Sequence, residues 1–435
     1  MDPLVIGLIS IALLFVIVLA GAPIGLAMVV VGVGGFAAIV GFDPALSVLQ
    51  TAAFETASTY SFTLVPLFML MGNLISQSGM ASDLFRGAAV LTRGGKGGLA
   101  IAGVTASAVF STVSGSSLAT ASTMTKVSYP EMVKRGYDPR LAAGSLAAGG
   151  TLGIMIPPSI ALLLYALITE QSVGEMFLAG ILPGILAYAL YVLTVVIMAR
   201  FWTGDPTAAL APSDDMGGVQ AWWTAMRLFA PAFGLFGLVM GGLYGGFFTP
   251  TEAGGAGSAF ALAYSVWKGM DLKAFLRALR STVDTTATIF FILIGAEVLG
   301  YLISTSQISF AMVDLMQGLE MGPWQILLSI MLFYIVLGCF MESLAMILLT
   351  VPIFFPVILD SGFDPVWFGV IAVVTVELGL ISPPVGMNLF MVKSVATQVP
   401  MRQIMVGVMP FILADIVRLV ILILVPSIVL FLPGR

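Results

Sequence analysis

Two pairs of consecutive prolines, at residues 157–158 and 383–384, are the positions in this sequence best suited to binding chemistry. A proline lacks the amide donor that a helix needs and clashes with the preceding turn, so a helix must stop at each pair. The stop leaves backbone carbonyls without donors, and hard cations prefer such oxygen ligands. A helix that restarts after the break offers free amides and a positive dipole end to an anion. Each pair therefore predicts a site that holds a cation and faces a carboxylate, with a simple packing kink as the alternative.

Two further segments have the composition of a sharp helical turn. Residues 111–117 read Ser-Thr-Val-Ser-Gly-Ser-Ser, and residues 338–343 read Gly-Cys-Phe-Met-Glu-Ser. Glycine permits a tight tip and the close approach of a ligand to the backbone, and the hydroxyls can contact that ligand. Close packing of small residues between helices is the alternative. Glu342, in the second segment, is either a functional buried acid or an acid that faces water at the tip.

An internal repeat relates these segments. When the sequence is shifted by 226 positions, residues 117–158 align with residues 343–384 without a gap and share eleven identical residues. Gly-Tyr-Asp-Pro at 136–139 falls on Gly-Phe-Asp-Pro at 362–365, and the two proline pairs coincide. Repeats that contain interrupted helices are typical of secondary transporters.

The composition requires a membrane. Of 435 residues, 59% are hydrophobic and 9% are charged, whereas an ordinary soluble domain has about 25% charged residues. The chain is long enough for on the order of a dozen crossings or half-crossings of a bilayer. It has no histidine, which excludes Ser-His-Asp catalysis, and its single cysteine excludes an internal disulfide. The net charge of −5 argues against a nucleic acid partner.

The distribution of charge predicts how the chain crosses. Basic residues gather near 86–96, 126–140, 200–227, 268–280 and 393–402, and acidic connections without bases alternate with them. Basic connections belong in the cytoplasm, which places the amino terminus outside, in the periplasm. The apolar runs about 98–118 and about 323–359 then start and end on one side, as re-entrant hairpins. The two copies of the repeat carry opposite charges at the same turn. The first copy has Lys134, Arg135 and Arg140 there, and the second has Asp360 and Asp364. This contrast predicts that the copies are inverted in the membrane.

These observations predict an all-α polytopic membrane protein of two inverted repeats. The first half, 1–202, contains the hairpin about 98–118 and a broken helix about 141–168. The second half, 223–435, contains the hairpin about 323–359 and a broken helix about 366–396. The polar segment 203–222 is the predicted cytoplasmic linker between them.

Five motifs resemble one known family. They are residues 114–120 (Ser-Gly-Ser-Ser-Leu-Ala-Thr), 130–137 (Pro-Glu-Met-Val-Lys-Arg-Gly-Tyr), 147–159 (Ala-Ala-Gly-Gly-Thr-Leu-Gly-Ile-Met-Ile-Pro-Pro-Ser), 248–254 (Phe-Thr-Pro-Thr-Glu-Ala-Gly) and 380–388 (Leu-Ile-Ser-Pro-Pro-Val-Gly-Met-Asn). Along essentially its whole length, the chain resembles the large membrane subunit of tripartite ATP-independent periplasmic (TRAP) transporters, of the dicarboxylate and sialic acid type.

The resemblance implies a sodium-driven elevator that imports organic acids, works with a small membrane subunit and a periplasmic substrate-binding protein, and is not an enzyme. It implies Na⁺ sites at the two pairs of hairpin and broken helix, mostly through backbone carbonyls. The first site maps to Ser111, Ser114, Gly153, Ile156 and Pro158, and the second to Gly338, Gly379, Ser382 and Val385. The candidate substrate residues are Ser116, Ser117, Ser159, Gly386 and Asn388.

Other functions remain open at this point. A stand-alone sodium and dicarboxylate symporter, or another anion transporter of similar fold, would need no binding protein. A passive channel would move its solute without sodium. The sequence does not distinguish C4-dicarboxylates, sugar acids, keto acids and aromatic acids as the solute.

Overall fold

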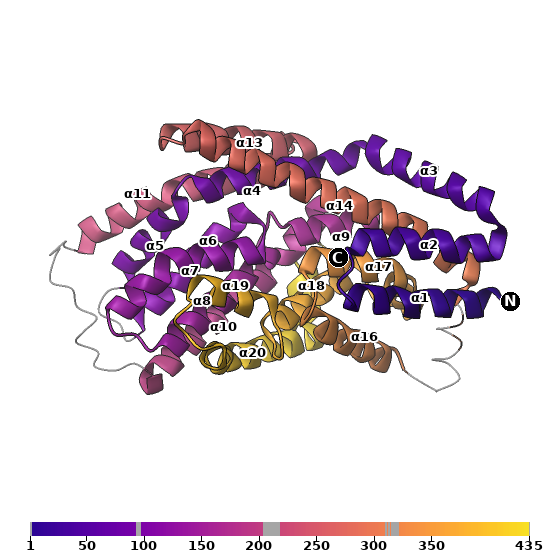
Figure 1. The fold of residues 1–435 in the computed structure, drawn as a ribbon. Coiled ribbons are helices and arrows are strands. Elements are labelled where there is room, and N and C mark those ends of the chain that lie inside the picture. Colours follow the sequence, from indigo (N-terminus) through magenta and orange to yellow (C-terminus); the bar gives the residue numbers. More distant parts are fainter. Residues whose placement is uncertain are drawn as a thin grey trace.

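The computed structural model describes residues 2–92, 97–202, 218–308, 311, 314 and 322–434, and all regular secondary structure in these ranges is helical (Figure 1). Residues 203–217 of the predicted linker, and Arg93 and Lys96 of the first basic connection, lie outside the described residues.

Within its described residues, the first half contains five amino-terminal helices and one short 3₁₀ turn, followed by the first hairpin, the first broken helix and a long helix. Its elements are α1 (Pro3–Leu19), α2 (Ile24–Val40), α3 (Phe42–Ser58), the short η1 (Tyr60–Thr63), α4 (Leu64–Gln77), α5 (Met80–Leu91), α6 (Gly98–Ser114), α7 (Ser117–Lys134), α8 (Pro139–Met155), α9 (Ile160–Ile168) and α10 (Val173–Trp202).

The second half follows the same order. Its elements are α11 (Gly218–Phe236), the π-helical η3 (Gly237–Gly241), α12 (Gly242–Tyr244), α13 (Pro250–Trp267), α14 (Leu272–Ser306), α16 (Pro323–Gly338), α17 (Ser343–Asp360), α18 (Pro365–Ile381), α19 (Met387–Val395), α20 (Met401–Leu424) and α21 (Ser427–Leu430).

The repeat extends over most of the fold. Adding 226 to the bounds of α7 and α8 gives 343–360 and 365–381, which are the bounds of α17 and α18. The same shift carries α2 to 250–266, against 250–267 for α13, and α10 to 399–428, which contains α20 at 401–424. The 42-residue sequence match is therefore one part of a duplication of whole helices.

The Gly-x-Asp-Pro motif occurs in both repeats because it forms the same turn between two helices in each. Gly136 and Gly362 have φ of 74° and 81°, a conformation that glycine adopts easily at the end of a helix. Asp138 and Asp364 then accept the first amides of α8 and α18, whose first residue is proline. Burial favours a higher pKa for Asp138, but hydrogen bonds from Arg140 outweigh it and lower that pKa below its usual value. This turn therefore keeps a charged carboxylate at the start of α8.

The first hairpin is longer than its apolar run indicates. The sequence predicted that it ends about residue 118, but its return arm is α7, which reaches Lys134. The arm is poor in large apolar residues because it packs inside the protein, where Thr120, Thr125 and Ser128 are fully buried. Its hydroxyls form local bonds, such as Thr125 Oγ1 to the Ala121 carbonyl at 2.6 Å. Hydropathy detects helices that face lipid and therefore misses this one.

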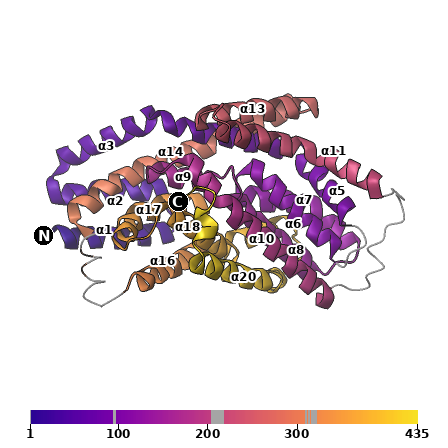
Figure 2. The same ribbon diagram turned by 180° about the vertical axis from the view of Figure 1, so that it is seen from behind.

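The hairpins and broken helices pack together beside a layer that contains α3, α4, α13 and α14. Figures 1 and 2 show these four helices along one edge of the molecule, with α6, α7, α8, α10, α18 and α20 below them. Within the described ranges, six helical segments are long and apolar enough to cross a membrane. The pair α3 and η1–α4, bent by 58°, makes a possible seventh. Exposed apolar side chains such as Leu8, Leu193 and Leu332 suit contact with lipid.

Candidate functional site: two interrupted helices and a buried charge network

The first interrupted helix stops between Met155 and Ile160. Pro157 and Pro158 supply no amide to the carbonyls of Gly153 and Ile154, which lie four residues earlier. The Ser159 hydroxyl donates to the Ile154 carbonyl and also accepts from the Leu162 amide. This leaves the Gly153 carbonyl as the oxygen that the proline pair exposes for a further ligand.

The tip of the first hairpin lies against this break. Gly115, with φ of 61°, ends α6, and Ser116 caps α7 by accepting from the Ala119 amide. A Cβ on Gly153 would lie 3.1 Å from the Ser116 carbonyl oxygen, and one on Gly115 would lie 3.5 Å from the Pro158 carbonyl oxygen. The structure thus places the predicted ligands Gly153 and Pro158 against the tip of the hairpin.

The remaining residues of the first predicted Na⁺ site lie next to this contact. The Ser114 hydroxyl shares a 2.7 Å hydrogen bond with Thr120 Oγ1, and the Ser111 carbonyl accepts the Gly115 amide. Ile156, at the break, is partly exposed.

The second interrupted helix repeats this arrangement with a closer backbone contact. A Cβ on Gly379 would lie 2.7 Å from Gly338 Cα, so only glycine allows α16 and α18 to approach this far. The Ser382 hydroxyl donates to the Leu378 carbonyl at 2.6 Å, which leaves its lone pairs available. The Gly386 amide donates to the Cys339 carbonyl at 3.0 Å, which ties the tip to the break. Val385 is partly exposed beside them.

The candidate substrate residues divide into two groups. The buried side chains of Ser117 on α7 and Asn388 on α19 bond to each other across the two repeats. Ser116, Ser159 and Gly386 instead form the local cap, break and tip bonds described above. The pair Ser117 and Asn388 is thus the polar contact that joins the tip of one repeat to the break of the other.

Glu342 caps a helix. Its carboxylate accepts from the Leu344 and Ala345 amides at 3.1 and 3.3 Å, at the start of α17. A negative charge is favourable at the amino end of a helix. Ser116 caps α7 at the equivalent position of the first repeat, so acid and hydroxyl perform the same structural task.

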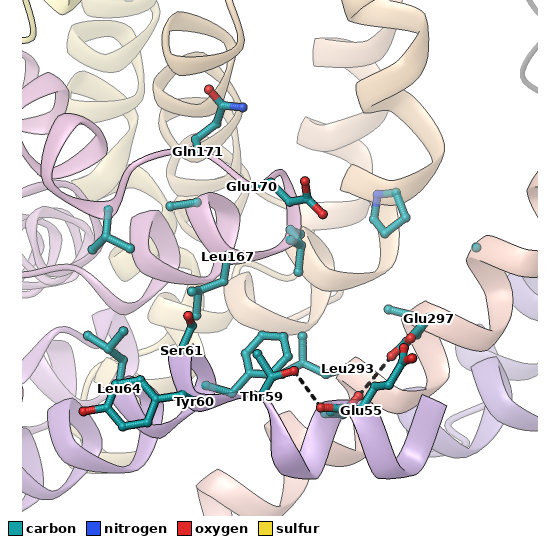
Figure 3. A pocket seen from close by; sticks show the side chains of 18 of the residues that line it. Glu55, Thr59, Tyr60, Ser61, Leu64, Leu167, Glu170, Gln171, Leu293 and Glu297 are labelled. Atoms are coloured by element: carbon teal, nitrogen blue, oxygen red, sulfur yellow. Dashed lines mark hydrogen bonds between the residues drawn. The ribbon is translucent and has the colours of Figure 1, made fainter. Parts of the chain in front are cut away.

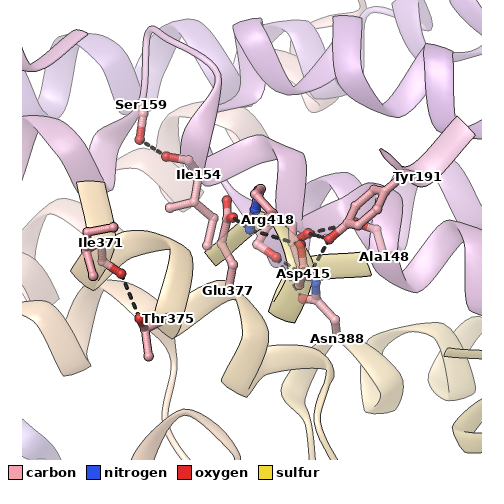
Figure 4. Close-up of polar contacts among 12 residues, drawn as sticks. Ala148, Ile154, Ser159, Tyr191, Ile371, Thr375, Glu377, Asn388, Asp415 and Arg418 are labelled. Carbon is pink, nitrogen blue, oxygen red and sulfur yellow. Dashed lines mark hydrogen bonds and ion pairs between the residues drawn. The ribbon is translucent and has the colours of Figure 1, made fainter. Parts of the chain in front are cut away.

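A fully buried charge network joins α10, α18 and α20 near these breaks (Figure 4). Arg418 Nη2 pairs with Glu377 Oε2 at 2.7 Å and with Asp415 Oδ1 at 3.0 Å. Tyr191 donates to Asp415 Oδ2 at 2.6 Å. Sequence reasoning missed Tyr191, Asp415 and Arg418, although two charges three residues apart in the apolar run of α20 are a signal for an intramembrane polar site.

A separate cavity of about 980 Å³ lies between α3, α14 and the turn that follows α9 (Figure 3). None of the predicted site residues lines it. Its lining includes Glu55, Glu170 and Glu297, and Thr56 Oγ1 donates to Glu297 at 3.2 Å. Three acids make this cavity unsuited to holding a carboxylate, since like charges repel.

Comparison with known proteins points to one family. The family model described as "Tripartite ATP-independent periplasmic transporter, DctM component" matches residues 11–428. The chain is 34% identical to a C4-dicarboxylate TRAP transporter large permease protein of Pseudomonas aeruginosa, over 93% of both chains. It is 32% identical to the sialic acid TRAP transporter large permease protein of Vibrio cholerae, over 86% of both.

A solved structure, that of the Alcanivorax borkumensis YdaH transporter, is similar in fold. The TM-score is 0.58 at 15% identity, over 88% of both chains. At this identity the similarity concerns the fold alone.

Proposed function

Because the chain belongs to the tripartite ATP-independent periplasmic transporter family, as its DctM component, we propose that it is a sodium-coupled subunit that imports an organic acid across the bacterial inner membrane. The family consists of transporters, so the chain is a multi-pass transporter subunit rather than an enzyme. The solute class is proposed from relatives named for C4-dicarboxylates and sialic acid.

The observation that carries the sodium proposal is the pair of matched breaks. At the first break Pro157 denies a donor to the Gly153 carbonyl, and at the second Pro384 denies one to the Leu380 carbonyl. The Gly379 carbonyl instead accepts from the Ser382 amide at 3.1 Å. A hairpin tip contacts the glycine of each break, Gly153 or Gly379. Carbonyl and hydroxyl oxygens around a gap in a helix suit a hard monovalent cation. The described residues contain no group of three or more His, Cys, Asp or Glu side chains suited to a transition metal.

The first Na⁺ is assigned to Ser111, Ser114, Gly153, Ile156 and Pro158, and the second to Gly338, Gly379, Ser382 and Val385. The substrate carboxylate then lies between the two sites, next to Ser117 and Asn388. Na⁺ at each break compensates the negative charge of the substrate in a region of low dielectric constant. The hairpins and broken helices move together as the elevator, against the layer that contains α3, α4, α13 and α14.

The remaining parts of the proposal concern partners and direction. A small membrane subunit and a periplasmic binding protein complete the transporter, and the binding protein delivers the solute. The amino terminus faces the periplasm, because the basic turn at Lys134, Arg135 and Arg140 belongs on the cytoplasmic side.

Uptake into proteoliposomes tests this function. The chain is reconstituted with its small subunit and binding protein, and the uptake of labelled C4-dicarboxylates and sialic acid is followed. We expect uptake to require an inward Na⁺ gradient, with a Hill coefficient above one, and to stop when the binding protein is omitted. Equal rates in K⁺ would refute sodium coupling, and uptake without the binding protein would favour the stand-alone symporter.

A further inference from the structure

The buried charge network lies between the two repeats. Thr151 on α8 and Glu377 on α18 are related by the 226-residue shift and are therefore equivalent positions. The helices between them, α10 and α20, are equivalent to each other. The network thus starts at one residue, crosses the paired helices at the centre of the duplication, and ends at the counterpart of that residue.

The connection between these two ends is continuous. The Thr151 and Tyr191 hydroxyls lie 2.9 Å apart, and Tyr191 donates to Asp415 Oδ2 at 2.6 Å. The single proton of the Thr151 hydroxyl has two acceptors, the Tyr191 oxygen and the Ala148 carbonyl at 2.8 Å. Arg418 Nη2 then joins Asp415 to Glu377. All five side chains are fully buried.

Both ends lie next to the breaks. Thr151 precedes Gly153 by two residues, and Glu377 precedes Gly379 by two. Gly153 carries the carbonyl that Pro157 leaves without a donor, and Gly379 is the residue that the second hairpin contacts at the other break. A shift of the turn before one break must therefore move an end of the network.

A gain in folding stability does not explain why these charged side chains are buried together. A buried ion pair contributes little net stability, because the loss of hydration offsets the attraction. This network also leaves Glu377 Oε1, Arg418 Nε and Arg418 Nη1 without a hydrogen-bond partner among the described residues. A partly satisfied buried network is more costly than an apolar core of the same volume. Charges at this depth in a membrane protein point to a functional role.

We propose that Thr151, Tyr191, Asp415, Arg418 and Glu377 are positioning residues that couple the two interrupted helices, so that Na⁺ at one break favours Na⁺ at the other. This coupling rests on the proposed sodium function and adds to it a physical connection between the two sites. It makes a transporter that holds only one Na⁺ rare.

Cys339, the only cysteine of the chain, reports on the second break. It lies at the tip of the second hairpin, and its Sγ is 3.6 Å from the Pro383 carbonyl oxygen. Na⁺ bound at this break is expected to hold the tip closed and to slow the reaction of Cys339 with a maleimide. The experiment follows this reaction in the purified full chain as NaCl replaces KCl at constant ionic strength.

The first break is then perturbed by Ser114→Ala, which removes a predicted ligand of the first site, in the other repeat from Cys339. With Tyr191 present, we expect the Na⁺ midpoint of Cys339 protection to rise about fivefold or more, a normal coupling magnitude. In a Tyr191→Phe background, which cuts the network, Ser114→Ala should leave that midpoint unchanged. Thr151→Val cuts the network at its end in the first repeat and should give the same result.

Tyr334→Phe is the matched control. Tyr334 is equally buried and accepts from the Thr350 hydroxyl at 2.8 Å, but that pair lies within the second hairpin. The effect of Ser114→Ala on Cys339 should persist in this background. The coupling is refuted if the effect survives both Tyr191→Phe and Thr151→Val, or if it is absent in the otherwise unchanged chain. A rate of Cys339 labelling that does not depend on the Na⁺ concentration would instead refute the proposed sodium function.

Discussion

Ser117 and Asn388, which are 271 residues apart in the chain, form two reciprocal hydrogen bonds in the interior of the protein. The Ser117 hydroxyl donates to Asn388 Oδ1 at 2.9 Å and accepts from Asn388 Nδ2 at 2.7 Å. Asn388 also donates to the Ala147 carbonyl at 3.3 Å. The tip of the first hairpin is thereby connected to the helix that follows the second break and to the helix that precedes the first.

This pair gives the first prediction. Ser117→Ala or Asn388→Leu alone should destabilise the protein by about 1–3 kcal/mol, because each leaves a buried polar group unpaired. The double variant removes both groups, so its thermal stability should recover in part while its uptake of a labelled C4-dicarboxylate stays low. Leucine is the residue at 162, the equivalent position in the first repeat. Recovery of uptake together with stability would mean that the pair serves packing alone.

The two prolines of the first break should differ in effect. Pro157→Ala restores an amide opposite the Gly153 carbonyl, which then closes the helix over a predicted Na⁺ ligand. Pro158→Ala restores an amide opposite the Ile154 carbonyl, which Ser159 already occupies. We expect Pro157→Ala to raise the Na⁺ concentration for half-maximal uptake more strongly, with similar expression of both variants. Equal Na⁺ dependence in the two would contradict the assignment of the Gly153 carbonyl.

Ser382→Ala tests a side-chain ligand at the second break. Loss of one hydroxyl that contacts a cation should raise the Na⁺ midpoint of uptake about tenfold, since a hydrogen bond or contact to a charge contributes roughly 1.5–3 kcal/mol. Ser361→Ala is the matched control, because Ser361 Oγ donates to the Val357 carbonyl at 2.7 Å in the same local geometry, away from the break. Similar Na⁺ midpoints for the two variants would contradict the assignment of Ser382 as a Na⁺ ligand.

Gly379→Ala tests the close contact between α16 and α18. Its Cβ would lie 2.7 Å from Gly338 Cα, so the helices must separate, at a cost of about 1–3 kcal/mol. Thermal unfolding measured with and without NaCl should show a lower midpoint and a reduced stabilisation by Na⁺. Gly255→Ala in α13, where the new Cβ meets no atom within 4 Å, should leave both unchanged. If Na⁺ stabilises Gly379→Ala as much as it stabilises the unchanged chain, this contact does not contribute to cation binding.

Lys134 and Asp360 test the inversion of the repeats. The two exposed residues are equivalent under the 226-residue shift, and they end α7 and α17. In a Cys339→Ala background, a cysteine introduced by Asp360→Cys should react with a membrane-impermeant maleimide in cells with a permeabilised outer membrane. One introduced by Lys134→Cys should react only after the inner membrane is opened. Equal labelling of both in sealed cells would contradict the inverted arrangement.

Much of the fold was predictable from the sequence because its signals are local. The proline pairs break α8–α9 and α18–α19 where they were expected, since a missing amide acts on its own turn whatever surrounds it. The Gly-x-Asp-Pro turns likewise stop one helix and start the next by themselves. Hydropathy failed at α7, whose buried hydroxyls replace apolar side chains.

The sequence by itself determined where the chain breaks, where it turns and that it is duplicated. Only the tertiary structure decided which of these places meet. The contact between Ser117 and Asn388, the approach of Gly338 to Gly379, and the connection from Thr151 to Glu377 all join segments distant in sequence or on different helices. Such contacts depend on how helices pack in three dimensions, and periodicity or spacing along one chain carries no record of that packing.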